Sequence, residues 1–141
     1  MSKRIDIFDT ICGALLLHLY DSFPVRQHIE FTDLPLEDEL EPLSPEQIEK
    51  WMEVFYETVI WLEQEGFIRF QSGTHDQDFF GVQLTMSGLA VLRSIPDSID
   101  NNKQSLAERI KGAFGEGGKV VSSEGLKIAV GSLVTMSSSI G

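Results

Sequence analysis

Clustered carboxylates between Asp33 and Glu46 are the first candidate for chemistry in this sequence. The stretch TDLPLEDELEPLSPE carries six acidic side chains, and carboxylate oxygens are ligands that a hard cation such as Ca²⁺ takes. It has no D-x-D-x-D-G register and no glycine at the turning position, so it does not match an EF-hand. We interpret residues 33–46 as a solvated acidic loop. That the protein is an enzyme or a metal-binding protein that uses this loop is one functional hypothesis, ranked below the protein-interaction and DNA-binding hypotheses.

The polar stretch Gln71–Asp78 contains a second group of potential ligands, His75, Asp76 and Asp78. Three such residues on one turn, with no second cluster elsewhere in the sequence, fall short of a zinc motif. We therefore predict no metal ligand.

Two further patterns imitate catalytic or cofactor-binding motifs. In AFGEGGKV, residues 113–120, Ala113 stands where a phosphate-binding loop needs its first glycine, and Val120 stands where it needs Ser or Thr. The histidines His18, His28 and His75 lie in unrelated contexts, and no Ser–His–Asp or Cys–His arrangement can be assembled. We predict no catalytic residue and no cofactor, and hence that the chain is not an enzyme.

Composition limits the class of protein further. The 141 residues are 42% hydrophobic and carry a net charge of −11, enough for one ordinary domain with a core. Residues 1–70 hold 15 acidic and 5 basic side chains. The negative electrostatic potential of this excess of acidic side chains repels polyphosphates and favours basic partners.

Cys12 is the only cysteine, so no intrachain disulfide can form, and its place in an apolar helix favours a buried, inert thiol. The N-terminus shows no signal peptide, and no apolar run is long enough to span a bilayer. We expect a cytoplasmic protein that does not bind membranes.

Helical periodicity and capping signals divide the chain into elements. A helix is predicted from Arg4 to about Tyr20, followed by a strand-like piece at Val25–Phe31. Ser44-Pro45-Glu46-Gln47 forms a capping-box start, and Gly66 provides the left-handed stop of that second helix. The faces predicted to be buried are Phe8, Ile11, Cys12, Leu15, Leu16 and Leu19 in the first helix, and Ile48, Trp51, Met52, Phe55, Val59 and Leu62 in the second.

The second half of the chain begins with strand-like runs at Phe67–Phe70 and Phe79–Leu84, joined by a hairpin tip. Thr85 caps a short helix, and Ser105–Phe114 reads as another. After a glycine-rich break, the tail carries Leu126, Ala129, Val130, Leu133 and Val134 at helical spacing. That face could pack on the domain itself, on a second copy or on a membrane surface.

The order helix, irregular segment, helix ending WLEQEGFIRF, hairpin and then LTMSGLAVL is similar to the winged-helix superfamily over residues 5–95. The most specific part is Leu84-Thr85 followed by Gly88 and Leu92, where the second wing strand leads into a capped helix. The resemblance implies an α+β winged-helix-like domain at residues 1–97. Residues 98–141 form a helical C-terminal appendage in this interpretation.

In DNA-reading members of that superfamily, the helix before the hairpin enters the major groove, and basic residues hold phosphates. Here the outward face of that helix carries Glu46, Glu49, Glu53 and Glu57 against the single Lys50. These carboxylates oppose phosphate contacts, so none of the family's functional residues can be transferred. We do not expect direct DNA binding.

Ile60 and Trp61 lie off the predicted buried stripe of the same helix, beside its acidic face. Large apolar groups next to charge often mark a protein interface, although they could also pack under residues 24–45 or under the tail. Our candidate interaction surface is Glu46, Glu49, Glu53, Glu57, Ile60 and Trp61. We predict a non-catalytic protein–protein interaction or assembly domain that binds a basic protein partner. We also predict that this chain forms a homo-oligomer. The alternative is a transcription regulator that binds DNA through an atypical face or with a basic partner.

Overall fold

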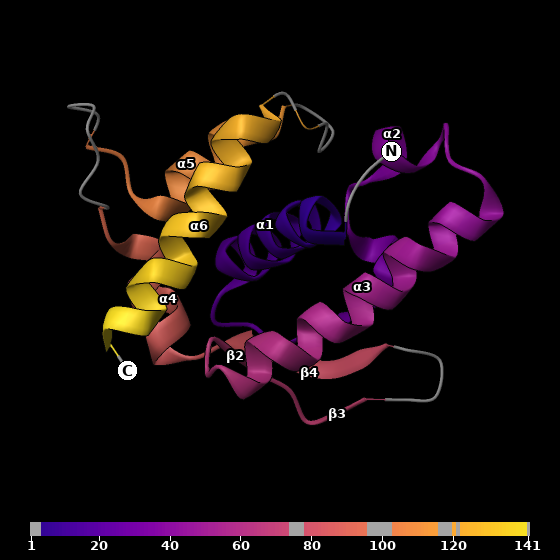
Figure 1. The fold of residues 1–141 in the computed structure, drawn as a ribbon. Coiled ribbons are helices and arrows are strands. Elements are labelled where there is room, and N and C mark those ends of the chain that lie inside the picture. Colours follow the sequence, from indigo (N-terminus) through magenta and orange to yellow (C-terminus); the bar gives the residue numbers. More distant parts are fainter. Residues whose placement is uncertain (1–3, 74–77, 96–102, 116–119, 121, 141) are drawn as a thin grey trace.

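The structure is a computed structural model that describes residues 4–73, 78–95, 103–115, 120 and 122–140 (Figure 1). This part of the chain forms an α+β fold with six α-helices and a small antiparallel sheet. The elements are α1 Arg4–Ser22, β1 Gln27–Ile29, the 3₁₀ turn η1 Phe31–Asp33, α2 Glu37–Leu40, α3 Pro45–Gln64, β2 Ile68–Arg69, β3 Ser72–Gly73, β4 Phe79–Leu84, α4 Met86–Arg93, α5 Leu106–Ala113 and α6 Ser123–Ile140.

Helix α1 is the centre of the fold and lies between α3 and α6 (Figure 1). Its buried residues are not confined to one narrow stripe, because neighbouring elements cover it on several sides. The predicted face is buried except for Phe8, which is half-buried, and Ile7 joins it. The helix ends two residues before Pro24, close to the predicted end.

Helix α3 begins and ends as its local signals predict. The Ser44 side chain accepts a hydrogen bond from the Gln47 N–H at 3.2 Å, and the Gln47 side chain accepts one from the Ser44 N–H at 2.8 Å. Gly66 has a φ of +84°, the left-handed conformation expected just after a helix. The prediction that Met52 is buried is wrong, since the helix turns Val54 and Thr58 into the core and leaves Met52 exposed.

Strand β4 is the middle of the sheet. Strand β1 pairs with one edge of it, and β2 and β3 follow one another along the other edge, all antiparallel. The predicted hairpin tip is therefore shortened, because Ser72 and Gly73 belong to a strand opposite Phe80 and Phe79. His75 and Asp76 lie outside the described residues.

A β-bulge interrupts the pairing of β1 with β4. Gln27 pairs with Val82 and Ile29 pairs with Phe79, so Phe80 and Gly81 together oppose the single residue His28. Gly81 has a φ of +67°, a conformation that glycine adopts without steric cost.

The acidic stretch 33–46 was predicted to be a loop. The prediction is wrong for Glu37–Leu40, which forms one turn of helix, α2. Leu34 and Leu36 are buried just before it. These two leucines anchor the stretch to the core, while most of its carboxylates remain in solvent.

The C-terminal helices pack on the rest of the chain. Helix α5 begins with a capping box between Ser105 and Glu108, and α4 is capped by the Thr85 hydroxyl. Helix α6 contacts α1, α4 and α5 and buries Leu126, Ala129, Val130 and Leu133 in the same hydrophobic cluster as α1 and α3. Four residues of the predicted face of the tail therefore pack on the chain itself, whereas its fifth residue, Val134, is 39% exposed.

Among the described helices, none is both long and apolar enough to cross a membrane.

Candidate functional site

The predicted acidic face of α3 is exposed along its length. Glu46, Glu49, Glu53 and Glu57 all lie at the surface, spaced three or four residues apart, so they form a line along one side of the helix. Lys50 is half-buried beside this line. The carboxylates are therefore accessible to a partner.

The line of glutamates leads to Ile60 and Trp61, which are both half-buried. The indole of Trp61 meets the Phe8 ring of α1 edge to face, with the centroids 5.5 Å apart. Contact with α1 thus covers part of the indole, and neither Ile60 nor Trp61 is fully exposed. The rest of the indole borders an open groove.

This α1–α3–α6 groove has a volume of about 710 Å³. Its residues are Arg4, Ile5, Phe8, Glu53, Val54, Glu57, Thr58, Trp61 and Val134. Ile5 is 59% exposed and Val134 is 39% exposed, so apolar side chains from two different helices face solvent at its edges. The structure brings together Glu53, Glu57 and Trp61 of the predicted surface here, and it adds residues of α1 and α6 that the sequence did not connect with them.

The charge of the groove is asymmetric. Glu53 and Glu57 belong to α3, and Arg4 is the only basic residue among the described residues that line the groove. A nitrogen of the Arg4 guanidinium lies 3.7 Å from a Glu53 carboxylate oxygen, but both side chains are mostly exposed. Water screens such a pair strongly, so Arg4 offsets little of the negative potential.

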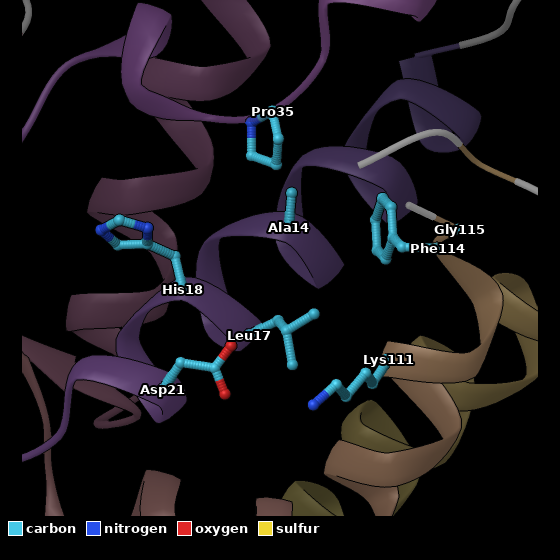
Figure 2. A pocket seen from close by; sticks show the side chains of 8 residues that line it. All are labelled: Ala14, Leu17, His18, Asp21, Pro35, Lys111, Phe114 and Gly115. Atoms are coloured by element: carbon cyan, nitrogen blue, oxygen red, sulfur yellow. The ribbon is translucent and has the colours of Figure 1, made fainter. Parts of the chain in front are cut away.

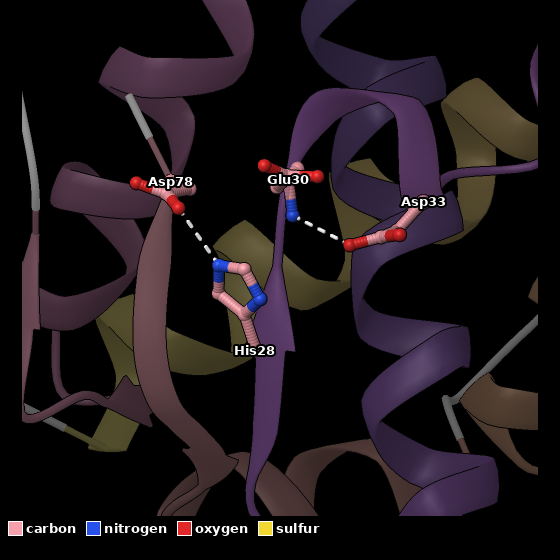
Figure 3. Close-up of polar contacts among 4 residues, drawn as sticks. All are labelled: His28, Glu30, Asp33 and Asp78. Carbon is pink, nitrogen blue, oxygen red and sulfur yellow. Dashed lines mark hydrogen bonds and ion pairs between the residues drawn. The ribbon is translucent and has the colours of Figure 1, made fainter. Parts of the chain in front are cut away.

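A second polar cluster lies on the sheet, where β1 runs beside the start of β4 (Figure 3). The Nε2 atom of His28 lies 2.8 Å from Oδ2 of Asp78. The His28 ring also stacks on the Phe80 ring, with the centroids 4.3 Å apart and the planes 3° from parallel. These two contacts hold the imidazole in one orientation.

Glu30 completes this sheet cluster. Because Ile29 pairs with Phe79, the antiparallel register places Glu30 across from Asp78. One ligand atom each from His28, Glu30 and Asp78 lies within 4.8 Å of the others. The Glu30 N–H donates to Oδ2 of Asp33 at 2.7 Å, which fixes the backbone at this point (Figure 3).

Sequence reasoning missed this cluster because it grouped Asp78 with His75 and Asp76 on the hairpin. The available signal was the alternation His28-Ile29-Glu30, which puts two polar side chains on one face of a strand with an apolar residue between them. The fifty residues that separate His28 from Asp78 hid the third member.

A pocket of about 600 Å³ lies between α1 and the end of α5 (Figure 2). Ala14, Leu17, His18 and Asp21 line it from α1, opposite Pro35, Lys111, Phe114 and Gly115. Figure 2 shows His18 on one side of α1 and Lys111 reaching in from α5 on the other. The imidazole and the ammonium group thus enter the pocket from two different helices.

Cys12 and Asp9 of α1 have raised pKa values. Burial raises the pKa of the Cys12 thiol well above its ordinary range, and the Asp9 charge adds to this effect. Burial, followed by the charge of Asp6, raises the pKa of Asp9 from 3.8 to about 6, against the opposing effect of Lys127. Cys12 is therefore the inert thiol that the sequence predicts.

No protein-family model, curated protein or solved structure matches this chain.

Proposed function

We propose that this chain is a non-catalytic protein-interaction domain that binds a basic amphipathic helix of a partner protein in the α1–α3–α6 groove. The observation that carries the proposal is the apolar groove beside Trp61, bordered by Glu53 and Glu57. A helical segment presents apolar side chains on one face, and such helices commonly occupy apolar grooves.

Charge identifies the occupant more closely. The glutamates of α3 extend from the groove to Glu46, and the whole chain carries a net charge of −11. A partner helix complements this line of glutamates if Lys or Arg residues flank its apolar face. Acidic residues at the same positions of the partner would be repelled. A second copy of this chain, which the predicted homo-oligomer requires, brings like charges together if it docks at the same face. A different, basic protein is therefore the occupant that we favour.

A winged-helix-like arrangement of residues 5–95 is part of the proposal. The order α1, β1, α2, α3, the β2–β3–β4 hairpin and α4 supports it, since this is the order on which the resemblance rests. In this arrangement α3 occupies the place of the DNA-reading helix, but its exposed glutamates suit a basic protein in place of phosphates.

Fluorescence anisotropy with a labelled amphipathic peptide of Leu and Lys tests the proposal on the full chain. A Leu/Glu peptide with the same pattern is the comparison. We expect the Leu/Lys peptide to bind, the Leu/Glu peptide not to bind, and affinity to fall with added salt because exposed charges are screened.

Two matched variants locate the binding. Glu53→Lys/Glu57→Lys reverses two charges at the groove and should weaken binding of the Leu/Lys peptide about tenfold or more, because attractive contacts become repulsive. Glu37→Lys/Glu41→Lys makes the same change of net charge on the exposed residues at α2 and should have a much smaller effect. Equal losses in the two variants would mean that net charge alone attracts the peptide, against the proposal.

Light scattering and DNA titration separate the other possibilities. A second copy would be the occupant if the unmodified chain is a dimer by light scattering, if Glu53→Lys/Glu57→Lys changes that solution mass, and if the Leu/Lys peptide does not bind. Salt-sensitive binding of duplex DNA by the unmodified chain would favour the regulator alternative.

A further inference from the structure

We propose that His28, Glu30 and Asp78 form a binding site for a divalent transition-metal ion, with Zn²⁺ the best match. The site lies on the face of the sheet where β1 runs beside β4, and it shares no residue with the α1–α3–α6 groove. The inference is therefore independent of the proposed function.

Asp78 provides the observation that a simple ion pair leaves unexplained. The residue is only 9% exposed, and its Oδ2 faces His28, but its Oδ1 is buried and has no hydrogen-bond partner among the residues that the structure describes. Leaving a buried carboxylate oxygen unpaired is costly. A cation bound through Oδ2 balances the charge of this buried carboxylate, while Oδ1 itself points away from His28 and Glu30 (Figure 3).

The opposition of Glu30 and Asp78 points the same way. The carboxylates of Glu30 and Asp78 place ligand oxygens within 4.8 Å of each other and repel, and the single imidazole of His28 balances at most one of the two charges. A doubly charged cation among the three side chains balances both carboxylates, which gives this pairing a physical reason.

The donor set selects the kind of ion. Imidazole nitrogen with two carboxylates suits Zn²⁺ and its neighbours, whereas Ca²⁺ and Mg²⁺ prefer oxygen ligands alone. Three protein ligands leave a further position for water, which the exposed side of His28 and Glu30 permits.

The present distances are close to those of a bound site. Ligand atoms on a tetrahedral zinc ion lie about 3.3 Å apart, since each bond is about 2 Å long. The His28 Nε2 and Asp78 Oδ2 atoms must separate slightly from 2.8 Å, and the exposed Glu30 side chain must move inward. Zn²⁺ then takes the Nε2 lone pair, and the ring keeps its proton on Nδ1.

Isothermal titration calorimetry of the full chain with Zn²⁺ tests the site, with Mg²⁺ and Ca²⁺ titrated separately. We expect one Zn²⁺ per chain and no comparable binding of Mg²⁺ or Ca²⁺. His28→Gln and Glu30→Gln should each weaken Zn²⁺ binding by at least about tenfold, the smallest loss typical of residues that support a metal. Both side chains are exposed, so these variants should fold even if Asp78→Asn does not.

His75→Gln and Asp38→Asn are the controls, and both should bind Zn²⁺ as the unmodified chain does. Imidazole resonances in NMR provide a second measurement, since Zn²⁺ should shift those of His28 and leave those of His18 in place. Equal Zn²⁺ affinity in His28→Gln and the unmodified chain, or loss of binding in His75→Gln alone, would overturn the proposal. Calcium binding as tight as zinc binding would do so too, because the imidazole would then not be a ligand.

Discussion

The Phe8 ring meets the Trp61 indole edge to face, at a centroid distance of 5.5 Å and an angle of 84° between the planes. The pair joins α1 to the C-terminal half of α3 and forms part of the α1–α3–α6 groove. One contact thus serves both the packing of two helices and the proposed binding surface.

Trp61→Ala should reduce both stability and binding of the Leu/Lys peptide. Removing a half-buried indole from an aromatic pair costs about 2 kcal/mol of unfolding free energy, less than for a fully buried tryptophan. Trp61→Phe retains an aromatic ring and should recover most of the stability. Urea denaturation and peptide anisotropy measure the two effects. Full peptide affinity in a folded Trp61→Ala variant would show that the groove is not the binding surface.

Asp9→Asn should change how stability depends on pH. Because the pKa of Asp9 is raised to about 6 in the fold, the folded state binds this proton more tightly than the unfolded state does. The group therefore contributes stability below its unfolded pKa of 3.8, and that contribution is lost as the pH rises towards 6. Screening of this partly exposed carboxyl limits the loss to about 1 kcal/mol.

The asparagine variant lacks this titration, so it should be more stable than the unmodified chain at neutral pH and should decline less between pH 4 and 6. Urea denaturation across that range measures the difference. Asp38→Asn, at an exposed position of α2, is the control for removing one negative charge. Identical pH profiles for Asp9→Asn and Asp38→Asn would contradict the assignment.

Gly88→Ala and Gly112→Ala should have opposite effects. A Cβ atom at Gly88 would lie 2.1 Å from the Phe67 carbonyl oxygen, so α4 must move away from the backbone before β2. We expect a loss of about 2–3 kcal/mol, in the range for overpacked sites. At Gly112, in α5, a Cβ meets nothing within 4 Å, and alanine should stabilise the helix by about 0.5–1 kcal/mol. Thermal unfolding compares the two directly.

Cys12 should react with a thiol reagent only when the protein opens. The side chain is fully buried, and its raised pKa keeps the thiol protonated at neutral pH. Absorbance after addition of a disulfide reagent should stay flat in buffer and rise in denaturant. Fast modification of the folded chain would mean that α1 is far more accessible than its packing indicates.

Local signals explain why much of the secondary structure could be predicted. The starts of α3, α4 and α5 depend on hydrogen bonds between residues three apart, at Ser44, Thr85 and Ser105. The stop at Gly66 depends on one residue's backbone conformation. Such features are complete within a few positions, so their residue types reveal them.

Burial was predicted less well where it depends on neighbours. Periodicity placed Met52 in the core, but the direction from which α1 and the sheet approach α3 decides that Val54 and Thr58 are buried there. Likewise, the acidic composition of residues 33–46 indicates a solvated loop, whereas two buried leucines tether it and one turn of helix forms.

The sequence alone determined the order of the longer helices and of β1, β2 and β4, the acidic face of α3 and most of the apolar face of α6, because each depends on the spacing of nearby residues. Only the tertiary structure decided that Val134 and Ile5 border the same groove as Trp61, and that Asp78 meets His28, fifty positions away in the sequence. Such contacts depend on how the helices and strands pack around α1. That packing is a property of the whole core, and no short stretch of sequence contains it.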